Sequence, residues 1–271
     1  MRRLRAFVTF GFVMLGLLAC KEKGLTRGEA QQALEESQVS TQAASLTSGS
    51  LEIATNFTIG GAVEDAAAEL RTFYTEQLPC AEVALDGNTL TVDYGVNGTC
   101  LYRGQTYQGR HSVTISRNDM ANVVVDHVWE DLQNEKVRVN GTATVTWNFD
   151  DPSRHVVHSL DWERLSDGKR WQGSGDRVQR PLDAGLATGF SVNGTRSWHG
   201  QQGNYDLSIN DVEMRWIDPV PQAGSYSLDT PFDKQLSMSF DRFDETTIIV
   251  TVASGDKSFD FKVTTLADAA E

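Results

Sequence analysis

Apolar and polar side chains alternate with a period of two, in one short run after another, between residues 80 and 264. Clear runs lie at 123–129, 143–149, 156–162, 236–240 and 248–252. Because successive residues of a strand point to opposite faces, this period is typical of strands with one buried face. Turn signals separate the runs: Asp86-Gly87, Asn97-Gly98, Asn140-Gly141, Asp167-Gly168, Asn193-Gly194 and Ser254-Gly255-Asp256. Such dipeptides favour two-residue hairpins. The sequence therefore predicts a mainly β protein with a long antiparallel meander of roughly ten to fourteen strands, as an extended or curved sheet, a sandwich or an open barrel.

One or two helices are predicted before the β region. Residues 62–78 gather their apolar side chains on one face, and Pro79 ends the pattern. Residues 28–47 are rich in Ala, Gln and Glu, but their apolar face is thin, so this helix is expected to dock weakly. Residues 51–59 alternate and predict a strand, with a loop between the helices as the alternative.

The first twenty residues have the pattern of an export signal. Arg2, Arg3 and Arg5 form a positive segment, and an uncharged apolar run follows from residue 6 to residue 19. This run is shorter than the about 20 residues that a membrane-spanning helix needs, and it fits the apolar region of a signal peptide. The run ends in the tetrapeptide Leu17-Leu18-Ala19-Cys20.

That tetrapeptide resembles the lipobox of bacterial lipoproteins. The resemblance implies that the thiol of Cys20 carries a diacylglyceryl group and that cleavage follows Ala19. Lys21, in place of Asp, favours the outer over the inner membrane in such proteins. The alternative is an ordinary signal peptide with an incidental cysteine. The rest of the chain resembles Gram-negative envelope lipoproteins of no named functional family, so the signal implies location and a lipid anchor only.

The expected organisation is a signal peptide at 1–19, a lipid-anchored tether at 20–27, a helical segment at 28–79, an antiparallel β domain at 80–266 and an acidic tail at 267–271. Weak joints at 181–191 and 218–224 leave open whether the β region is one domain or two. Val-Asn-Gly-Thr recurs at unequal spacing, which fits either a duplicated β-unit or ordinary hairpins: 96–99, 139–142 and 192–195.

The cysteines predict one disulfide. With Cys20 assigned to lipid, Cys80 and Cys100 remain, and two leftover thiols in an exported domain usually pair. A metal pair or two free thiols are the alternatives. The formal net charge of −13 makes nucleic acid an unlikely partner, because an acidic surface repels phosphates. It also repels anionic membranes, so the bilayer is expected to hold the protein through acylated Cys20.

The sequence predicts no catalytic residue, metal site or cofactor. It contains no GxSxG elbow, phosphate-binding loop or HExxH motif. His111, His127 and His158 fall in apolar rows and are expected to be structural, whereas His155 lies on the face opposite His158 and His199 is expected to be exposed. Acidic clusters are expected to be solvated turns, with calcium binding as the alternative: Asp150-Asp151 and Asp241, Asp244, Glu245.

Tryptophans provide the candidate binding residues. Trp171 and Trp198 lie beside glycine and charged residues, and we expect them to be exposed aromatics that bind a partner. The other four fall in apolar rows and are expected in the core: Trp129, Trp147, Trp162 and Trp216.

Three functions remain open at this stage. The first is a non-enzymatic β-scaffold that binds an envelope protein or glycan. The second is a carrier of an apolar ligand, which requires a large dry cavity, lined by Val145, Trp147, Leu160 and Trp162. The third is an envelope glycan or peptide hydrolase, which requires acids or histidines that converge in a cleft.

Overall fold

One long, curved antiparallel sheet forms most of the protein. The computed structural model describes residues 24–265, apart from 56–61, 96, 103, 119–121, 149–152, 184, 186–187 and 217. Fourteen strands follow one another in chain order from β1 to β14, except that β3 pairs only with β4. The predicted mainly β meander with N-terminal helices is confirmed, and the sheet is open, with β1 and β14 as its edges. The predicted signal peptide at 1–19, Cys20 and the predicted acidic tail at 267–271 lie outside the described residues.

Two helices precede the strands, α1 (Arg27–Ile53) and α2 (Val63–Gln77). The strands have these bounds: β1 (Glu82–Asp86), β2 (Thr89–Tyr94), β3 (Cys100–Tyr102), β4 (Gln105–Arg117), β5 (Val123–Gln133), β6 (Val137–Asn148), β7 (Ser153–Arg164), β8 (Lys169–Pro181), β9 (Phe190–Gly200), β10 (Gly203–Met214), β11 (Ala223–Asp229), β12 (Gln235–Arg242), β13 (Thr247–Ser254) and β14 (Lys257–Thr264). The sheet continues across both expected joints, because β8 pairs with β9 and β10 pairs with β11.

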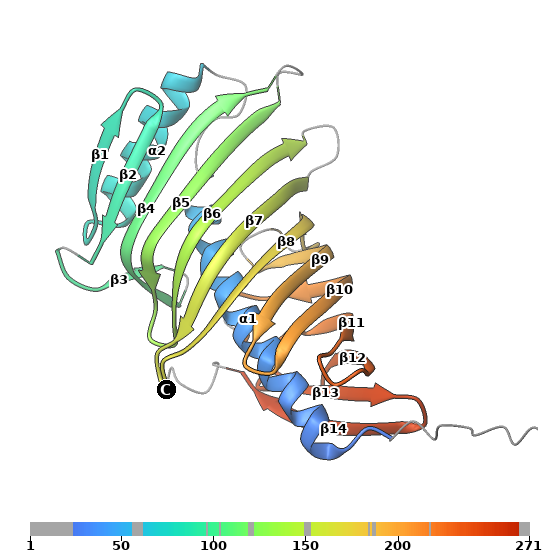
Figure 1. Ribbon diagram of the computed structural model, residues 1–271. Helices are drawn as coiled ribbons and strands as arrows, with labels where there is room; N and C mark the ends of the chain where they lie inside the picture. Colours follow the sequence, from blue (N-terminus) through green and yellow to red (C-terminus); the bar gives the residue numbers. More distant parts are fainter. Residues whose placement is uncertain are drawn as a thin grey trace, which may run out of the picture.

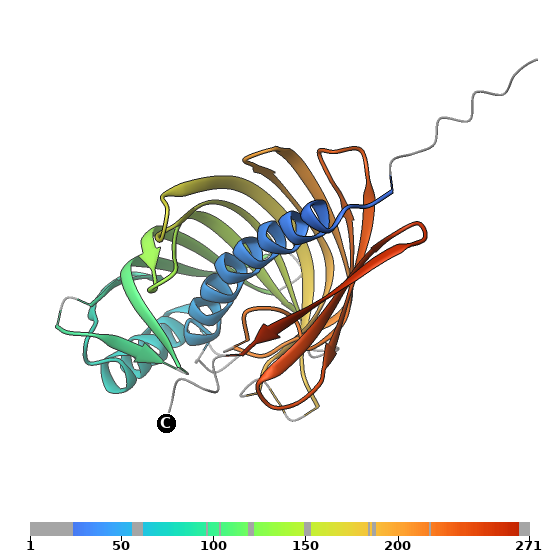
Figure 2. The ribbon, with the colours of Figure 1, turned by 90° about the horizontal axis from the view of Figure 1, so that it is seen from below.

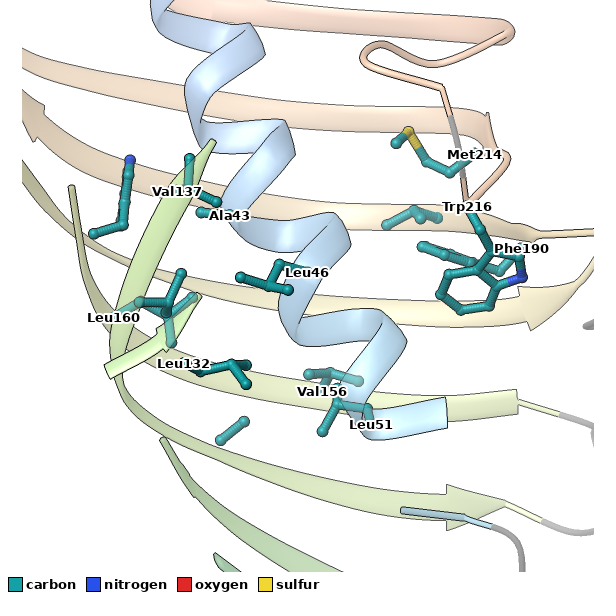
Figure 3. Close-up of a cluster of buried hydrophobic side chains, with 14 of the residues drawn as sticks. Ala43, Leu46, Leu51, Leu132, Val137, Val156, Leu160, Phe190, Met214 and Trp216 are labelled. Atoms are coloured by element: carbon teal, nitrogen blue, oxygen red, sulfur yellow. The ribbon is translucent and has the colours of Figure 1, made fainter. Parts of the chain in front are cut away.

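Helix α1 lies in the hollow of the curved sheet (Figures 1 and 2). It contacts strands as far apart in the sheet as β6 and β13, whereas α2 packs on β1, β2 and β4 at one end. Inward-facing side chains of the strands and the side chains of α1 together form the core. In Figure 3, Leu46 and Leu51 of α1 lie among Leu132, Val156 and Leu160 of the sheet.

The first helix is longer and more deeply buried than its sequence suggests. A capping box fixes its start, because the Thr26 hydroxyl accepts from the Glu29 amide and the Glu29 carboxylate accepts from the Thr26 amide. The predicted strand at 51–59 is wrong where it is described, since Leu51 and Ile53 belong to the last turn of α1. The expected weak docking is also wrong: the sheet wraps around α1, so small and polar side chains are buried on several of its sides.

Close contact between α1 and the sheet depends on Gly49. A Cβ added at Gly49 would lie 2.3 Å from the hydroxyl oxygen of Tyr107, whose side chain is fully buried. We therefore expect Gly49→Ala to lower the free energy of unfolding by about 1–3 kcal/mol, despite the better helix propensity of alanine. Gly28→Ala is the matched control, because a Cβ there meets no atom within 4 Å. Equal unfolding midpoints in urea for both variants would contradict the close contact.

Three of the predicted hairpin turns are wrong. Asn97-Gly98 connects β2 to β3, and these two strands do not pair with each other. Asn140-Gly141 lies within β6 and Asn193-Gly194 within β9, and both face a β-bulge on a neighbouring strand. The Asn140 side-chain oxygen accepts from the backbone N–H of Asp131, and Asp131 has a positive φ of 50°. In the same way, the Asn193 side-chain oxygen accepts from the backbone N–H of Asp211, and Asp211 has a positive φ of 46°. The recurring Val-Asn-Gly-Thr of these two strands thus supports a bulge rather than closing a hairpin.

The predicted disulfide is present. Cys80 and Cys100 are joined, with their Cα atoms 5.3 Å apart. The bond connects the segment after α2 to β3, so it attaches the helical end of the protein to the sheet.

Candidate functional site

The two tryptophans expected to be exposed are buried. Trp171 is 4% exposed and Trp198 is 3% exposed, and both indole N–H groups donate to one carboxylate oxygen of Glu36, at 2.7 and 3.4 Å. The prediction failed because Trp171 shares the inward face of β8 with Gly173, so the usual apolar alternation is hidden there. A Cβ at Gly173 would collide with both Trp162 and Trp198, which shows that large rings cover this glycine.

Glu36 belongs to a row of buried polar groups between α1 and the hollow face of the sheet, which we call the polar seam. Helix α1 contributes small or acidic side chains, and the sheet contributes longer ones that donate hydrogen bonds. The polar seam consists of Glu36, Ser40, Ser48, Ser50 and Glu52 from α1, and Trp129, Arg154, Trp171, Arg177, Gln179, Arg196 and Trp198 from the sheet.

Hydrogen bonds link one end of the seam into a chain. Arg154 lies 3.5 Å from the carboxylate of Glu52 and donates to the Gln179 side-chain oxygen at 2.7 Å. The Gln179 amide donates in turn to the hydroxyl of Ser48 at 3.3 Å. Arg177 donates to the same hydroxyl at 3.3 Å. Since charge-assisted hydrogen bonds are strong where water is excluded, this chain fixes the C-terminal half of α1 against β7 and β8.

Arg196 holds the middle of the helix. One of its terminal nitrogens donates to the backbone carbonyl of Ser40 at 2.9 Å and to its hydroxyl at 3.1 Å. The other donates to the Tyr226 hydroxyl at 3.4 Å. The seam thus contains three arginines but two glutamates, and its glutamates contact Arg154 and the two indoles rather than Arg177 or Arg196.

Three histidines are buried in the same hollow, as their apolar rows suggested. His111 and His127 are 2.9 Å apart between ring nitrogens and stack with Trp129. Burial lowers the pKa of His111 to about 3 and holds that of His127 well below its usual value. Burial, followed by the charges of Arg177 and Arg196, lowers the pKa of His158 to about 2.

The remaining candidates are surface groups or lie outside the described residues. His155 and His199 are exposed, and His155 lies on the face opposite His158, as predicted. Asp244 is exposed and accepts from the Thr246 amide, whereas Asp150-Asp151 falls outside the described residues. Across the described ranges, no group of three or more His, Cys, Asp or Glu side chains is placed to hold a metal ion.

A shallow cleft lies at the side of α1. It has a volume of about 100 Å³ and is lined by α1, β4, the turn before β6 and the segment after β10. Asp218 lines it, and burial raises the pKa of this carboxyl, which Arg242 contacts. Its lining also includes the exposed Glu135 and Lys136, neutral amides such as Gln105, and the hydroxyls of Ser45 and Thr106.

The cavities that described residues form between α1 and the sheet are small. Two cavities lined entirely by described residues lie there, with volumes of about 20 and 10 Å³. Each holds at most one or two water-sized species. Of the row proposed for a carrier, Val145, Leu160 and Trp162 are buried in the core and Trp147 packs against it.

Comparisons of the chain with protein families, curated proteins and solved structures find no match. Neither described helix combines the length and apolarity that crossing a bilayer requires. The seam could not be found from the sequence because the partners that meet across it are 79 to 162 residues apart. The local signal is the occurrence of glutamates and serines together in one helix.

Proposed function

We propose that this chain is an exported lipoprotein, anchored through acylated Cys20, whose β domain is a non-enzymatic scaffold that binds an envelope partner. The observation that carries the proposal is that α1 occupies the hollow of the sheet, where a carrier would hold its ligand. Small-molecule sites usually have volumes of about 300–1,000 Å³, and the two cavities between α1 and the sheet are far smaller. A partner would therefore bind the outside of the protein.

The outer face of the sheet suits a polar partner. Short hydroxyl side chains face solvent in register across neighbouring strands, as in Ser159 of β7, Ser174 of β8 and Ser197 of β9. Such a surface offers many hydrogen-bond donors and acceptors with little side-chain entropy to lose. A glycan or a polar protein surface fits this chemistry better than a lipid does.

The start of α1 would place the domain close to the membrane. Lys234, just before β12, donates to the carbonyl of Gly24 at 3.3 Å and pairs with Glu29 at 2.5 Å. Gly24 follows Cys20 by four positions, and an extended chain over that distance spans at most about 14 Å. The loop between β11 and β12 would thus face the bilayer, which leaves the outer sheet face free for a partner.

Replacing the proposed acylation site tests the anchor. We expect Cys20→Ser to abolish fatty-acid labelling and to release the protein from the membrane fraction, because the acyl chains supply the attachment. The matched control is the double variant Cys80→Ser/Cys100→Ser, which removes the other two cysteines and should keep both label and membrane attachment. A Cys20→Ser protein that stays labelled and sediments with membranes would overturn the proposal.

A further inference from the structure

Two arginines of the polar seam are buried without a carboxylate partner. Arg177 is 3% exposed and Arg196 is 7% exposed. Their hydrogen bonds go to Ser48, to Ser40 and to the Tyr226 hydroxyl, all of them neutral groups. Within the described part of the chain, neither guanidinium forms an ion pair, although the sequence contains 37 acidic residues. Buried charges are normally paired, because removing a charge from water is costly.

Both guanidinium groups also have an unused donor. The Nε of Arg177 and the Nε of Arg196 are buried and have no hydrogen-bond partner among the described residues. Burial, followed by the charges of Arg196 and Arg154, lowers the pKa of Arg177 to about 9, so this side chain is still a cation at neutral pH. The two donors are therefore charged, dehydrated and available.

The two side chains lie side by side. Arg177 of β8 pairs with Gly194 of β9, two residues before Arg196, so the arginines are diagonal neighbours on the hollow face of the sheet. They line one cavity of about 20 Å³ together with Ser48 and Tyr226, and no acidic side chain lines it. A volume of this size holds one species about as large as a water molecule. Phosphate and sulfate are too large for it.

We propose that this cavity binds a single monatomic anion of the halide class, with chloride as the physiological ion. The anion would accept from both guanidinium groups and neutralise the excess positive charge of the polar seam. Since Arg177 and Arg196 also hold Ser48 and Ser40, the bound ion would fasten α1 to the sheet. The inference stands independently of the membrane anchor and of any partner on the outer face.

The test is the thermal stability of the purified protein as chloride replaces gluconate at constant ionic strength. A ligand that binds the folded state alone raises Tm by mass action. We expect a saturating rise of roughly 5–10 °C at a chloride concentration about a hundredfold above Kd. Arg177→Gln and Arg196→Gln should each abolish most of this rise. Arg170→Gln is the control, because the Arg170 side chain is 79% exposed, and it should retain the full rise.

A second measurement covers the case in which the variants do not fold. Chloride-35 NMR of the unaltered protein should show excess line broadening that bromide displaces, and crystals grown with bromide should show anomalous density between Arg177 and Arg196. Identical melting in chloride and gluconate would overturn the proposal. So would a chloride response that survives both arginine substitutions, or a cavity that contains only water.

Discussion

Lowering the pH from 7 to 5 is expected to reduce the free energy of unfolding by about 6 kcal/mol, or about 2 kcal/mol for each of three buried histidines. The unfolded chain binds protons at these histidines near the ordinary pKa of 6.5, whereas His111, His127 and His158 stay neutral in the folded state. Their pKa values are lowered on folding, so stability is complete above 6.5 and falls steadily below it. Urea unfolding at both pH values measures the loss.

The charged groups beside the histidines affect how much the free energy of unfolding falls between pH 7 and pH 5. His111 and His127 face each other, His127 also faces the charge of Arg154, and His158 faces Arg177 and Arg196, so these neighbours disfavour a protonated ring. Asp218 acts in the opposite direction, because burial raises its pKa and the folded state takes up its proton first. Its contribution offsets only part of the loss from three histidines.

Single replacements separate the buried histidines from the exposed one. His158→Gln should reduce the loss between pH 7 and pH 5 by about 2 kcal/mol, whatever its effect on stability at pH 7. His199→Gln should leave the pH dependence unchanged, because that side chain is exposed. A protein equally stable at pH 7 and pH 5 would contradict the neutral, buried state of the three histidines.

Breaking the buried ion pair of the polar seam is expected to cost about 3–5 kcal/mol. Arg154→Met removes the guanidinium that contacts the Glu52 carboxylate in a nearly dry site, since the two side chains are 2% and 8% exposed in the folded protein. The double variant Arg154→Met/Glu52→Gln removes both charges and should recover part of the loss. Equilibrium unfolding of the four proteins in the cycle gives the coupling free energy, which we expect to be about 1–3 kcal/mol.

A surface pair provides the control for this cycle. Arg170 and Glu163 are 3.0 Å apart, but the arginine is largely in water. Arg170→Met should therefore change the free energy of unfolding by at most about 1 kcal/mol. Equal losses for Arg154→Met and Arg170→Met would show that α1 does not shield its partners from water.

Most of the sheet could be predicted from the sequence because most strands carry their own signal. Inward Leu236 and Met238 of β12 alternate with outward Ser237 and Ser239, and a local period of two needs no knowledge of distant partners. Predicted hairpins failed at Asn140-Gly141 and Asn193-Gly194, where the same dipeptide supports a bulge on the adjacent strand. Turn chemistry alone does not distinguish these two uses of an Asn-Gly pair.

The helix and the seam could not be predicted in the same way. Helix α1 lacks a broad apolar face because its neighbours are arginine, glutamine and indole N–H groups as well as aliphatic side chains. Trp171 was misplaced because the inward positions that follow it on β8 are glycines and then Arg177. The burial of α1 and of Trp171 thus depends on residues that lie on another element, far away in the sequence.

Helix α1 precedes every strand of the sheet, yet some of its partners lie in β13, nearly two hundred residues later. During synthesis α1 therefore stays exposed until almost the whole polypeptide, including β13, has been made. Its serines, threonines and glutamates keep it compatible with water in that interval, where a leucine-rich helix would invite aggregation. The polar seam thus also allows α1 to be synthesised before the strands that bury it.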